Sequence, residues 1–172
     1  MLYTCETCVY KRLNDALRKL DVARLAPLLP YLKLLLAGLY TLPLRRETVF
    51  RGVRGDYHLD YDGVGAEPFT WWCFTSTSFD AHVARSPPFL GESGKRMFFT
   101  IDAMGVDITL YSSHGGEREL LLLPGSKFRV SRSVPARHGP GAADTIWRYD
   151  LVAVDTQSIS FSHPHWNKHN QQ

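Results

Sequence analysis

Two glutamates stand two residues apart at the start of an apolar run, in the segment Glu117-Arg118-Glu119. The four leucines of residues 120–123 follow and end at Pro124-Gly125, which predicts a buried strand closed by a turn. Side chains at i and i+2 of a strand share a face, so the two carboxylates are expected to project together. Because neighbouring anions repel, this pattern favours a site for a cation or a cationic transition state. The alternative is that Glu117 and Arg118 belong to a solvated loop and only Glu119 joins the strand.

Two upstream motifs carry the other candidate side chains. Arg51 follows Val49-Phe50 at the end of a short expected strand and precedes Gly52. Its planar guanidinium suits phosphate oxygens, and the alternative is a surface ion pair. Ser76 opens the Ser-Thr-Ser segment 76–78 after an aromatic run; on its own it is typical of a strand-end serine that caps a turn.

The elements that must position these residues change in character near residue 48. Residues 9–42 have helical periodicity broken at Pro27 and Pro30, and the leucine-rich part 31–40 is expected to be the more buried helix. Short strands punctuated by Gly, Pro and Asp are expected at 48–50, 69–74, 95–101, 106–111, 119–123, 127–134 and 146–154.

Helices followed by strands predict an α+β fold, with N-terminal helices and then two packed, mostly antiparallel β-sheets. We expect a single domain over 1–172, with a helical part at 9–42, a β core at 48–155 and a polar tail at 156–172.

Composition narrows the classes of function. The 172 residues are 44% hydrophobic and 22% charged, as in ordinary globular domains. The net charge of +3 comes without a basic block, which disfavours nucleic acid as a partner. No uninterrupted apolar stretch reaches the length of a membrane span, and the first residues lack the pattern of a signal peptide. We therefore expect a monomer without a membrane partner.

Three cysteines, Cys5, Cys8 and Cys73, form no evident disulfide framework. Such a chain fits a reducing compartment, or a protein that does not need bridges. Cys5 and Cys8 have the spacing of a zinc-binding pair, but no second pair completes four ligands, and no metal is expected.

Taken in order, the three motifs resemble those of arginine-specific mono-ADP-ribosyltransferases of the Arg/Ser/Glu class, a family that includes eukaryotic enzymes and bacterial toxins. In that family an aromatic-Arg-Gly strand, a Ser-Thr-Ser strand and a Glu-x-Glu strand follow one another, as do residues 50–52, 76–78 and 117–119 here. The family's next stretch, apolar-apolar-Pro-Gly-small-x-Phe-x-Val, matches residues 122–130. The resemblance covers roughly residues 25–155.

The resemblance implies the ADP-ribosyltransferase fold, with NAD as co-substrate and no metal. Extracellular members of the family carry paired disulfides, which three cysteines cannot form, so the resemblance also implies either a cytoplasmic protein or a secreted effector. It implies that Glu119 binds the nicotinamide ribose and stabilises an oxocarbenium-like transition state, as carboxylates do in glycoside hydrolysis. Ser76 would orient Glu119, and Arg51 would pair with the NAD pyrophosphate. The further cofactor-binding residues implied are Gly52, Thr77 and Phe89, of which Phe89 would stack on the nicotinamide or else anchor its loop.

Glu117 is the residue that the resemblance connects with acceptor choice, because Glu there accompanies arginine and Gln accompanies other acceptors. The guanidinium of an arginine acceptor is protonated at neutral pH, with a pKa above about 12. Glu117 is therefore expected to orient it and to take its proton as the new bond forms. The loop expected to present the protein substrate is Tyr111, Ser112, Ser113, His114, Gly115 and Gly116. Within it, His114 is read as a solvated residue, and Tyr111 fits a core strand equally well.

The function implied is NAD-dependent transfer of ADP-ribose to a protein arginine, with release of nicotinamide. One alternative is an NAD glycohydrolase, which would use Arg51, Ser76 and Glu119 and leave Glu117 idle. A second alternative is a non-catalytic module of the same fold that binds a partner through the 111–116 loop.

Overall fold

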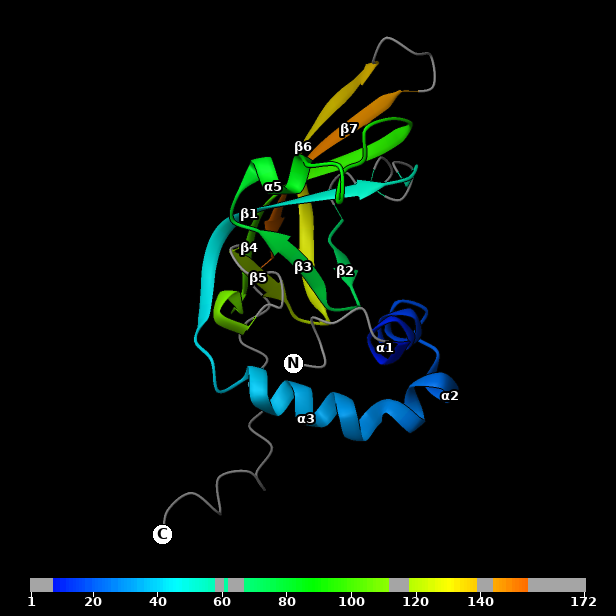
Figure 1. Ribbon diagram of the computed structural model, residues 1–172, viewed down its shortest axis with the longest axis vertical. Helices are drawn as coiled ribbons and strands as arrows, with labels where there is room; N and C mark the ends of the chain where they lie inside the picture. The colour runs from blue at the N-terminus through cyan, green and yellow to red at the C-terminus, as the bar shows by residue number, and fades with distance from the viewer. Residues whose placement is uncertain (1–7, 58–60, 62–66, 112–117, 139–143, 155–172) are drawn as a thin grey trace.

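The computed structural model of the chain describes residues 8–57, 61, 67–111, 118–138 and 144–154 (Figure 1). The expected helical part is confirmed as four segments: α1 (Cys8–Arg18), α2 (Val22–Leu25), the 3-10 helix η1 (Ala26–Leu28) and α3 (Leu29–Leu39). Asp21 caps α2 by accepting a hydrogen bond from the main-chain N of Arg24. Pro27 and Pro30 lie in the first turns of η1 and α3, where proline is tolerated, so each proline begins a helix as well as ending one.

The two longer helices differ in how much of their surface is covered. In α1, Leu13 and Ala16 are fully buried. In α3 only Leu39 is buried, and Leu34 is 74% exposed. The expectation that the leucine-rich helix is the more buried one is therefore wrong. Leucines occur all around α3, whereas only one side of it meets the core, and the helix runs along the outside of the molecule in Figure 1.

The helical run Val22–Leu39 is long and apolar enough to cross a membrane by length and composition, with a mean hydropathy of 1.5 and 6% of it buried. The sequence reading sought an uninterrupted apolar stretch and passed over this run, because Arg24 and Lys33 lie within it. One such helix is not by itself an indication of a membrane protein.

In the described part of the chain, seven strands follow the helices. They are β1 (Leu44–Arg54), β2 (Phe69–Trp71), β3 (Thr75–Ser78), β4 (Lys95–Asp107), β5 (Glu119–Leu122), β6 (Ser126–His138) and β7 (Thr145–Ala153). Helix α5 (Ala81–Arg85) lies between β3 and β4, and the 3-10 helix η2 (Thr109–Tyr111) follows β4.

The strands form a seven-stranded sheet in the order β1-β3-β5-β4-β7-β6-β2, in which β1 also pairs with β4. All pairings are antiparallel except that of β4 with β7. The α+β class is confirmed. The strands expected in two sheets are joined into one hydrogen-bonded network, because the 13-residue β4 pairs with β1, β5 and β7.

Two expected strands are interrupted, and local side chains explain both breaks. The run 69–74 stops after Trp71, because the N–H of Phe74 donates to the buried side chain of Asn14 in α1 at 3.1 Å. The run 106–111 stops at Asp107, whose Oδ1 accepts a 3.0 Å hydrogen bond from the N–H of Thr109 and turns the chain into η2.

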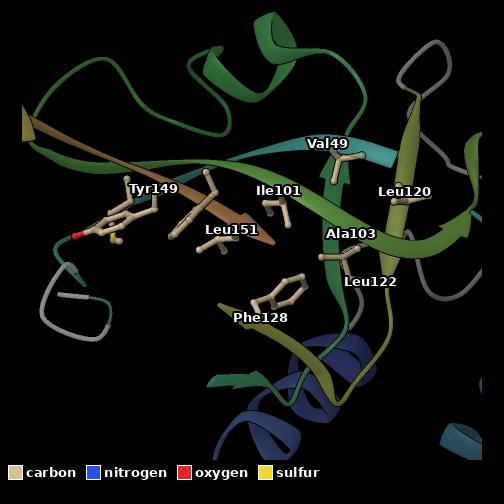
Figure 2. Packing of buried hydrophobic residues seen from close by; sticks show 10 residues of the cluster. Val49, Ile101, Ala103, Leu120, Leu122, Phe128, Tyr149 and Leu151 are labelled. Carbon is tan, nitrogen blue, oxygen red and sulfur yellow. The ribbon is translucent and has the colours of Figure 1, made fainter. Parts of the chain in front are cut away.

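The leucine run of β5 supplies two cores, one on each face of the sheet. Leu120 and Leu122 join a cluster with residues of β1, β4, β6 and β7, which Figure 2 shows from close by. Leu121 points the other way, into a cluster with Leu13 and Leu17 of α1. A strand buried on both faces needs a continuous apolar run, so the prediction of a buried strand from this run is confirmed.

Candidate functional site

Arg51 extends from β1 to the neighbouring strand β3. Its Nη1 donates a 2.6 Å hydrogen bond to the main-chain carbonyl oxygen of Ser76. The two strands pair at Phe50↔Ser78, so the guanidinium lies close to the point where they separate. Among the described residues no carboxylate pairs with Arg51, and the surface ion-pair alternative loses its support.

Glu119 is the first residue of β5, and its cross-strand partner in β3 is Ser78. Ser76 pairs with Leu121 in the same register. The side chains of Ser76, Ser78 and Glu119 therefore share one face, with Ser76 and Glu119 as diagonal neighbours about 7–8 Å apart. Both residues are described, and no direct hydrogen bond joins the Ser76 hydroxyl to the Glu119 carboxylate. That Ser76 orients Glu119 stays a prediction.

The expected substrate loop lies mostly outside the described residues, as does the first glutamate. Those residues are Ser112, Ser113, His114, Gly115, Gly116 and Glu117. Tyr111 is described: it closes η2, is 40% exposed and donates its N–H to the carbonyl of Ile108 at 2.8 Å. It is a surface residue and not part of a core strand.

The side chain of Thr77 makes a contact between two strands. Its side chain is 3% exposed, and its hydroxyl donates a 2.6 Å hydrogen bond to the carbonyl of Leu120 across the β3–β5 pair. The alternation along β3 turns it away from the face of Ser76 and Glu119. The hydroxyl of Thr77 therefore joins two strands, and a role of this residue in cofactor binding stays a prediction.

The packing of α5 against β1 explains why residue 52 is a glycine. A Cβ at this position would lie 2.1 Å from the carbonyl oxygen of Ala84 in α5, so only glycine admits the helix this close to β1. The segment after α5 is held to β1 through Arg54, whose Nη2 donates to the carbonyl of Pro88 at 2.8 Å. Phe89 in this segment is 39% exposed, and its stacking on nicotinamide stays a prediction.

A pocket of about 400 Å³ lies beside Arg51. Arg18 of α1 also lines it, and among the described lining residues none is acidic. The aromatic residues of its wall are Tyr57, Tyr61, Trp71, Trp72 and Phe99. Thr75 lines the pocket, whereas its neighbour Ser76 and Glu119 do not. The pocket and the Ser76–Glu119 face therefore lie on opposite faces of β3, and Arg51 connects them.

Arg18 is the lining residue that sequence reasoning missed. It is the last residue of α1, next to the buried Leu17, and its Nη2 lies 3.9 Å from Sγ of Cys73. An exposed cation at the rim of a buried helix face is the signal that could have identified it. Within the described residues no group of three or more His, Cys, Asp or Glu side chains gathers to hold a metal. Cys5 and the side chain of Cys8 lie outside that part of the chain.

Comparison with known proteins places the motifs in a family. A family model described as NAD:arginine ADP-ribosyltransferase matches residues 1–139, a range that contains Arg51, Ser76 and Glu119. A protein of Mycobacterium avium (strain 104) named as NAD(+)--arginine ADP-ribosyltransferase Mav is 34% identical over 142 residues. That match covers 81% of this chain and 16% of Mav, so the chain spans about a sixth of the length of this relative.

Solved structures share the fold. The ADP-ribosyltransferase Vis from Vibrio splendidus, in complex with agmatine, has a TM-score of 0.64 at 22% identity over 91% of this chain and 74% of its own. Exoenzyme S from Pseudomonas aeruginosa, in complex with human 14-3-3 protein beta and bound to Carba-NAD, has a TM-score of 0.57 at 22% identity over 88% of this chain and 69% of its own. The expected ADP-ribosyltransferase fold is thereby confirmed.

Proposed function

The chain belongs to the NAD:arginine ADP-ribosyltransferase family, and on that premise we propose that it transfers ADP-ribose from NAD to the guanidinium of a protein arginine and releases nicotinamide. One observation carries the proposal: the fold brings the arginine, serine and second glutamate of the three motifs onto adjacent strands. Arg51 touches the main chain of Ser76, and Ser76 lies diagonally across from Glu119.

The pocket beside Arg51 has the chemistry of a site for a dinucleotide. Two guanidinium groups, from Arg18 and Arg51, line it without an acidic neighbour among the described residues. One guanidinium can donate two parallel hydrogen bonds to the oxygens of a phosphate, so these two side chains suit the two phosphates of NAD. Tyr57 and Trp72, which are 52% and 46% exposed, offer ring faces on which a base can stack.

In this proposal NAD reaches both faces of β3. The phosphates lie on the pocket side, against Arg51, and the nicotinamide ribose extends past the point where β1 and β3 separate. There it meets the face that carries Ser76 and Glu119. The pairing of the two strands at Phe50↔Ser78 supports this course.

The chemistry follows from the charge that develops during the reaction. The bond between C1 of the ribose and the nicotinamide nitrogen breaks, its electron pair goes to the leaving nicotinamide, and positive charge grows on the ribose. A fixed carboxylate at Glu119 stabilises that charge in the transition state more than in the ground state. A nitrogen of the acceptor guanidinium then bonds to C1, and Glu117 accepts the proton that it loses. The role of Glu117 rests on the resemblance, because this residue lies outside the described part of the chain.

The test is incubation of the protein with NAD and agmatine, followed by mass spectrometry of nicotinamide and ADP-ribosyl-agmatine. We expect both products from the wild type. Glu119→Gln keeps the shape and removes the charge, and should lower both by about 10²-fold or more. Glu47→Gln makes the same change at a carboxylate of another strand, β1. It is the matched control and should behave as the wild type. Release of nicotinamide without formation of ADP-ribosyl-agmatine would indicate an NAD glycohydrolase. The absence of both products would indicate a non-catalytic module.

We further propose that the whole protein acts as a secreted toxin or effector on a host protein that presents an arginine. The support is the shared fold with Vis, which is a toxin. Labelling of lysates with biotin-NAD in the presence of the protein, compared with its Glu119→Gln variant, would reveal such a target. Labelled bands that persist with the variant would contradict the proposal.

A further inference from the structure

We propose that Thr109 is a positioning residue for Glu119: its hydroxyl holds the main-chain N–H of Glu119 and thereby fixes the first residue of β5. The inference rests on the proposed function, since it concerns the carboxylate that would stabilise the ribose cation. Thr109 belongs to none of the three motifs and does not line the pocket.

Glu119 needs such support because of where it stands. It is the first residue of β5, and strand ends fray unless their main-chain groups are bound. Its N–H donates to Oγ1 of Thr109 at 3.1 Å, and its carbonyl accepts from the N–H of Ile108 at 3.0 Å. Both polar main-chain groups of Glu119 are thus held by the segment that follows β4.

The hydroxyl of Thr109 takes a place that a main-chain carbonyl would fill in a regular ladder. The pairing of β4 with β5 runs through Val106↔Leu121 and Asp107↔Leu120, which sets Ile108 opposite Glu119. A hydrogen-bonded antiparallel pair exchanges two bonds. Here the carbonyl of Ile108 instead accepts from Tyr111 to close η2, at 2.8 Å. Thr109 therefore supplies the acceptor that the N–H of Glu119 would otherwise lack.

Asp107 holds Thr109 in turn. Its Oδ1 accepts the N–H of Thr109 at 3.0 Å, and its Oδ2 lies 3.9 Å from Nη1 of Arg45 on β1. The side-chain hydrogen bond from Thr109 keeps the pKa of Asp107 below its ordinary value, aided by the main-chain bond and by the charges of Arg45 and Arg118. The hydroxyl oxygen of Thr109 has lone pairs that accept, and one of them takes the N–H of Glu119.

The consequence concerns geometry rather than binding. Fixing both main-chain groups of Glu119 fixes the direction of its Cα–Cβ bond, and with it the face on which the carboxylate stands beside Ser76. A small displacement of a catalytic group lowers the rate of the chemical step more than it lowers affinity for the substrate. Loss of the Thr109 hydroxyl should therefore lower kcat and leave KM for NAD almost unchanged.

The first measurement is independent of activity. Hydrogen exchange of the Glu119 amide, followed by NMR, should quicken by about tenfold in Thr109→Val, the scale of one hydrogen bond. Thr109→Ser keeps the hydroxyl and should exchange as the wild type does. Unchanged exchange in Thr109→Val overturns the proposal whatever the activity. Faster exchange in Thr109→Val, together with a wild-type protein that releases no nicotinamide, would support the role of Thr109 in holding Glu119 and would reject the proposed function.

The second measurement is the steady-state rate of nicotinamide release. Thr109→Val should lower kcat by about tenfold or more with KM for NAD changed by less than about twofold, and Thr109→Ser should restore most of the rate. Leu39→Val, which trims a buried side chain of α3, is the control for simple loss of stability and should keep the wild-type kcat. An equal fall in Leu39→Val, or a Thr109→Ser variant as slow as Thr109→Val, overturns the proposal.

Discussion

The guanidinium of Arg51 bonds to the main-chain carbonyl of Ser76 and not to its hydroxyl. Any residue at position 76 would keep this contact, so the connection of β1 to β3 does not depend on the serine side chain. The hydroxyl stands on the other side of β3, on the face of Glu119. If NAD binds as proposed, the two groups of Ser76 would serve different ends of it.

Replacement of Ser76 by alanine separates these two contributions. Ser76→Ala keeps the carbonyl that holds Arg51 and removes the group expected to orient Glu119. We expect kcat for nicotinamide release to fall by about tenfold, with the dissociation constant for NAD nearly unchanged. Steady-state kinetics and calorimetry measure the two quantities. A loss of NAD affinity without loss of kcat would show that Ser76 binds the cofactor and does not position Glu119.

How much of the fold and of the candidate site could be predicted depends on whether a feature rests on neighbouring residues or on contacts between distant segments. Arg51, Ser76 and Glu119 are predicted as site residues because their types and order are specific. Strand β5 could be predicted because a strand buried on both faces needs a continuous apolar run. The exposure of α3 could not be predicted in the same way. Its leucines indicate a helix, but their density does not say which side another element covers.

Residues that act through tertiary contacts could not be predicted from the sequence, because no local pattern marks a contact between distant segments. Arg18 reaches the pocket only because α1 packs beside the β2–β3 connection, where Asn14 bonds to Phe74. Thr109 matters because its hydroxyl replaces a ladder carbonyl, and no local pattern marks that exchange. Membership of a motif does not reveal which face of the strand a side chain occupies, so the buried bond of Thr77 to the carbonyl of Leu120 could not be predicted either.

The pocket assignment predicts that two arginines contribute to NAD affinity. Arg51→Lys and Arg18→Lys each keep a charge and lose the planar fork, and each should weaken NAD binding by about 1–2 kcal/mol. Calorimetric titration measures the change. Arg12→Lys on the exposed side of α1 is the control and should bind as the wild type does. If Arg18→Lys binds NAD normally while Arg51→Lys does not, the phosphates lie outside the pocket that the two arginines share.

The contact of α1 with the sheet predicts a large effect of one buried amide. Asn14 is 5% exposed, and its Oδ1 accepts the N–H of Phe74, itself 2% exposed. Asn14→Ala removes this hydrogen bond from a buried N–H and should lower the free energy of unfolding by about 1–3 kcal/mol. Urea unfolding measures it. Thr41→Ala, which removes an exposed hydroxyl bonded to the carbonyl of Gly38, should cost less than about 0.5 kcal/mol. Equal losses of stability in the two variants would mean that the buried hydrogen bond of Asn14 contributes no more than the exposed one of Thr41.

The pair formed by Arg46 and Asp102 predicts a dependence of stability on pH. Two 3.0 Å hydrogen bonds join the guanidinium to the carboxylate. They hold the pKa of Asp102 below its ordinary value of 3.8, chiefly through the side-chain hydrogen bond from Arg46. A depressed carboxylate pKa stabilises the fold above the unfolded-state pKa, and this contribution is lost as pH falls through the folded-state pKa.

The measurement for this pair is thermal unfolding of the wild type and of Asp102→Asn. At about pH 6 the wild type should have the higher melting temperature, and the difference should vanish well below the ordinary carboxyl pKa. Both side chains are more than a third exposed, so high salt should also reduce the difference. A difference that is the same at both pH values would contradict an electrostatic origin.

The last prediction separates a transferase from a hydrolase. Water needs no carboxylate to orient it as a guanidinium does, so Glu117 and Glu119 should have different effects when changed. Glu117→Gln should abolish transfer to agmatine and leave most NAD hydrolysis, whereas Glu119→Gln should lower both. Glu117→Asp keeps the charge but shortens the reach by one methylene, and should give an intermediate loss of transfer. Mass spectrometry of ADP-ribosyl-agmatine and free ADP-ribose in the same reactions measures the ratio. A parallel fall of transfer and hydrolysis in Glu117→Gln would place both glutamates at the ribose, because a residue that acts only on the acceptor cannot slow the reaction with water.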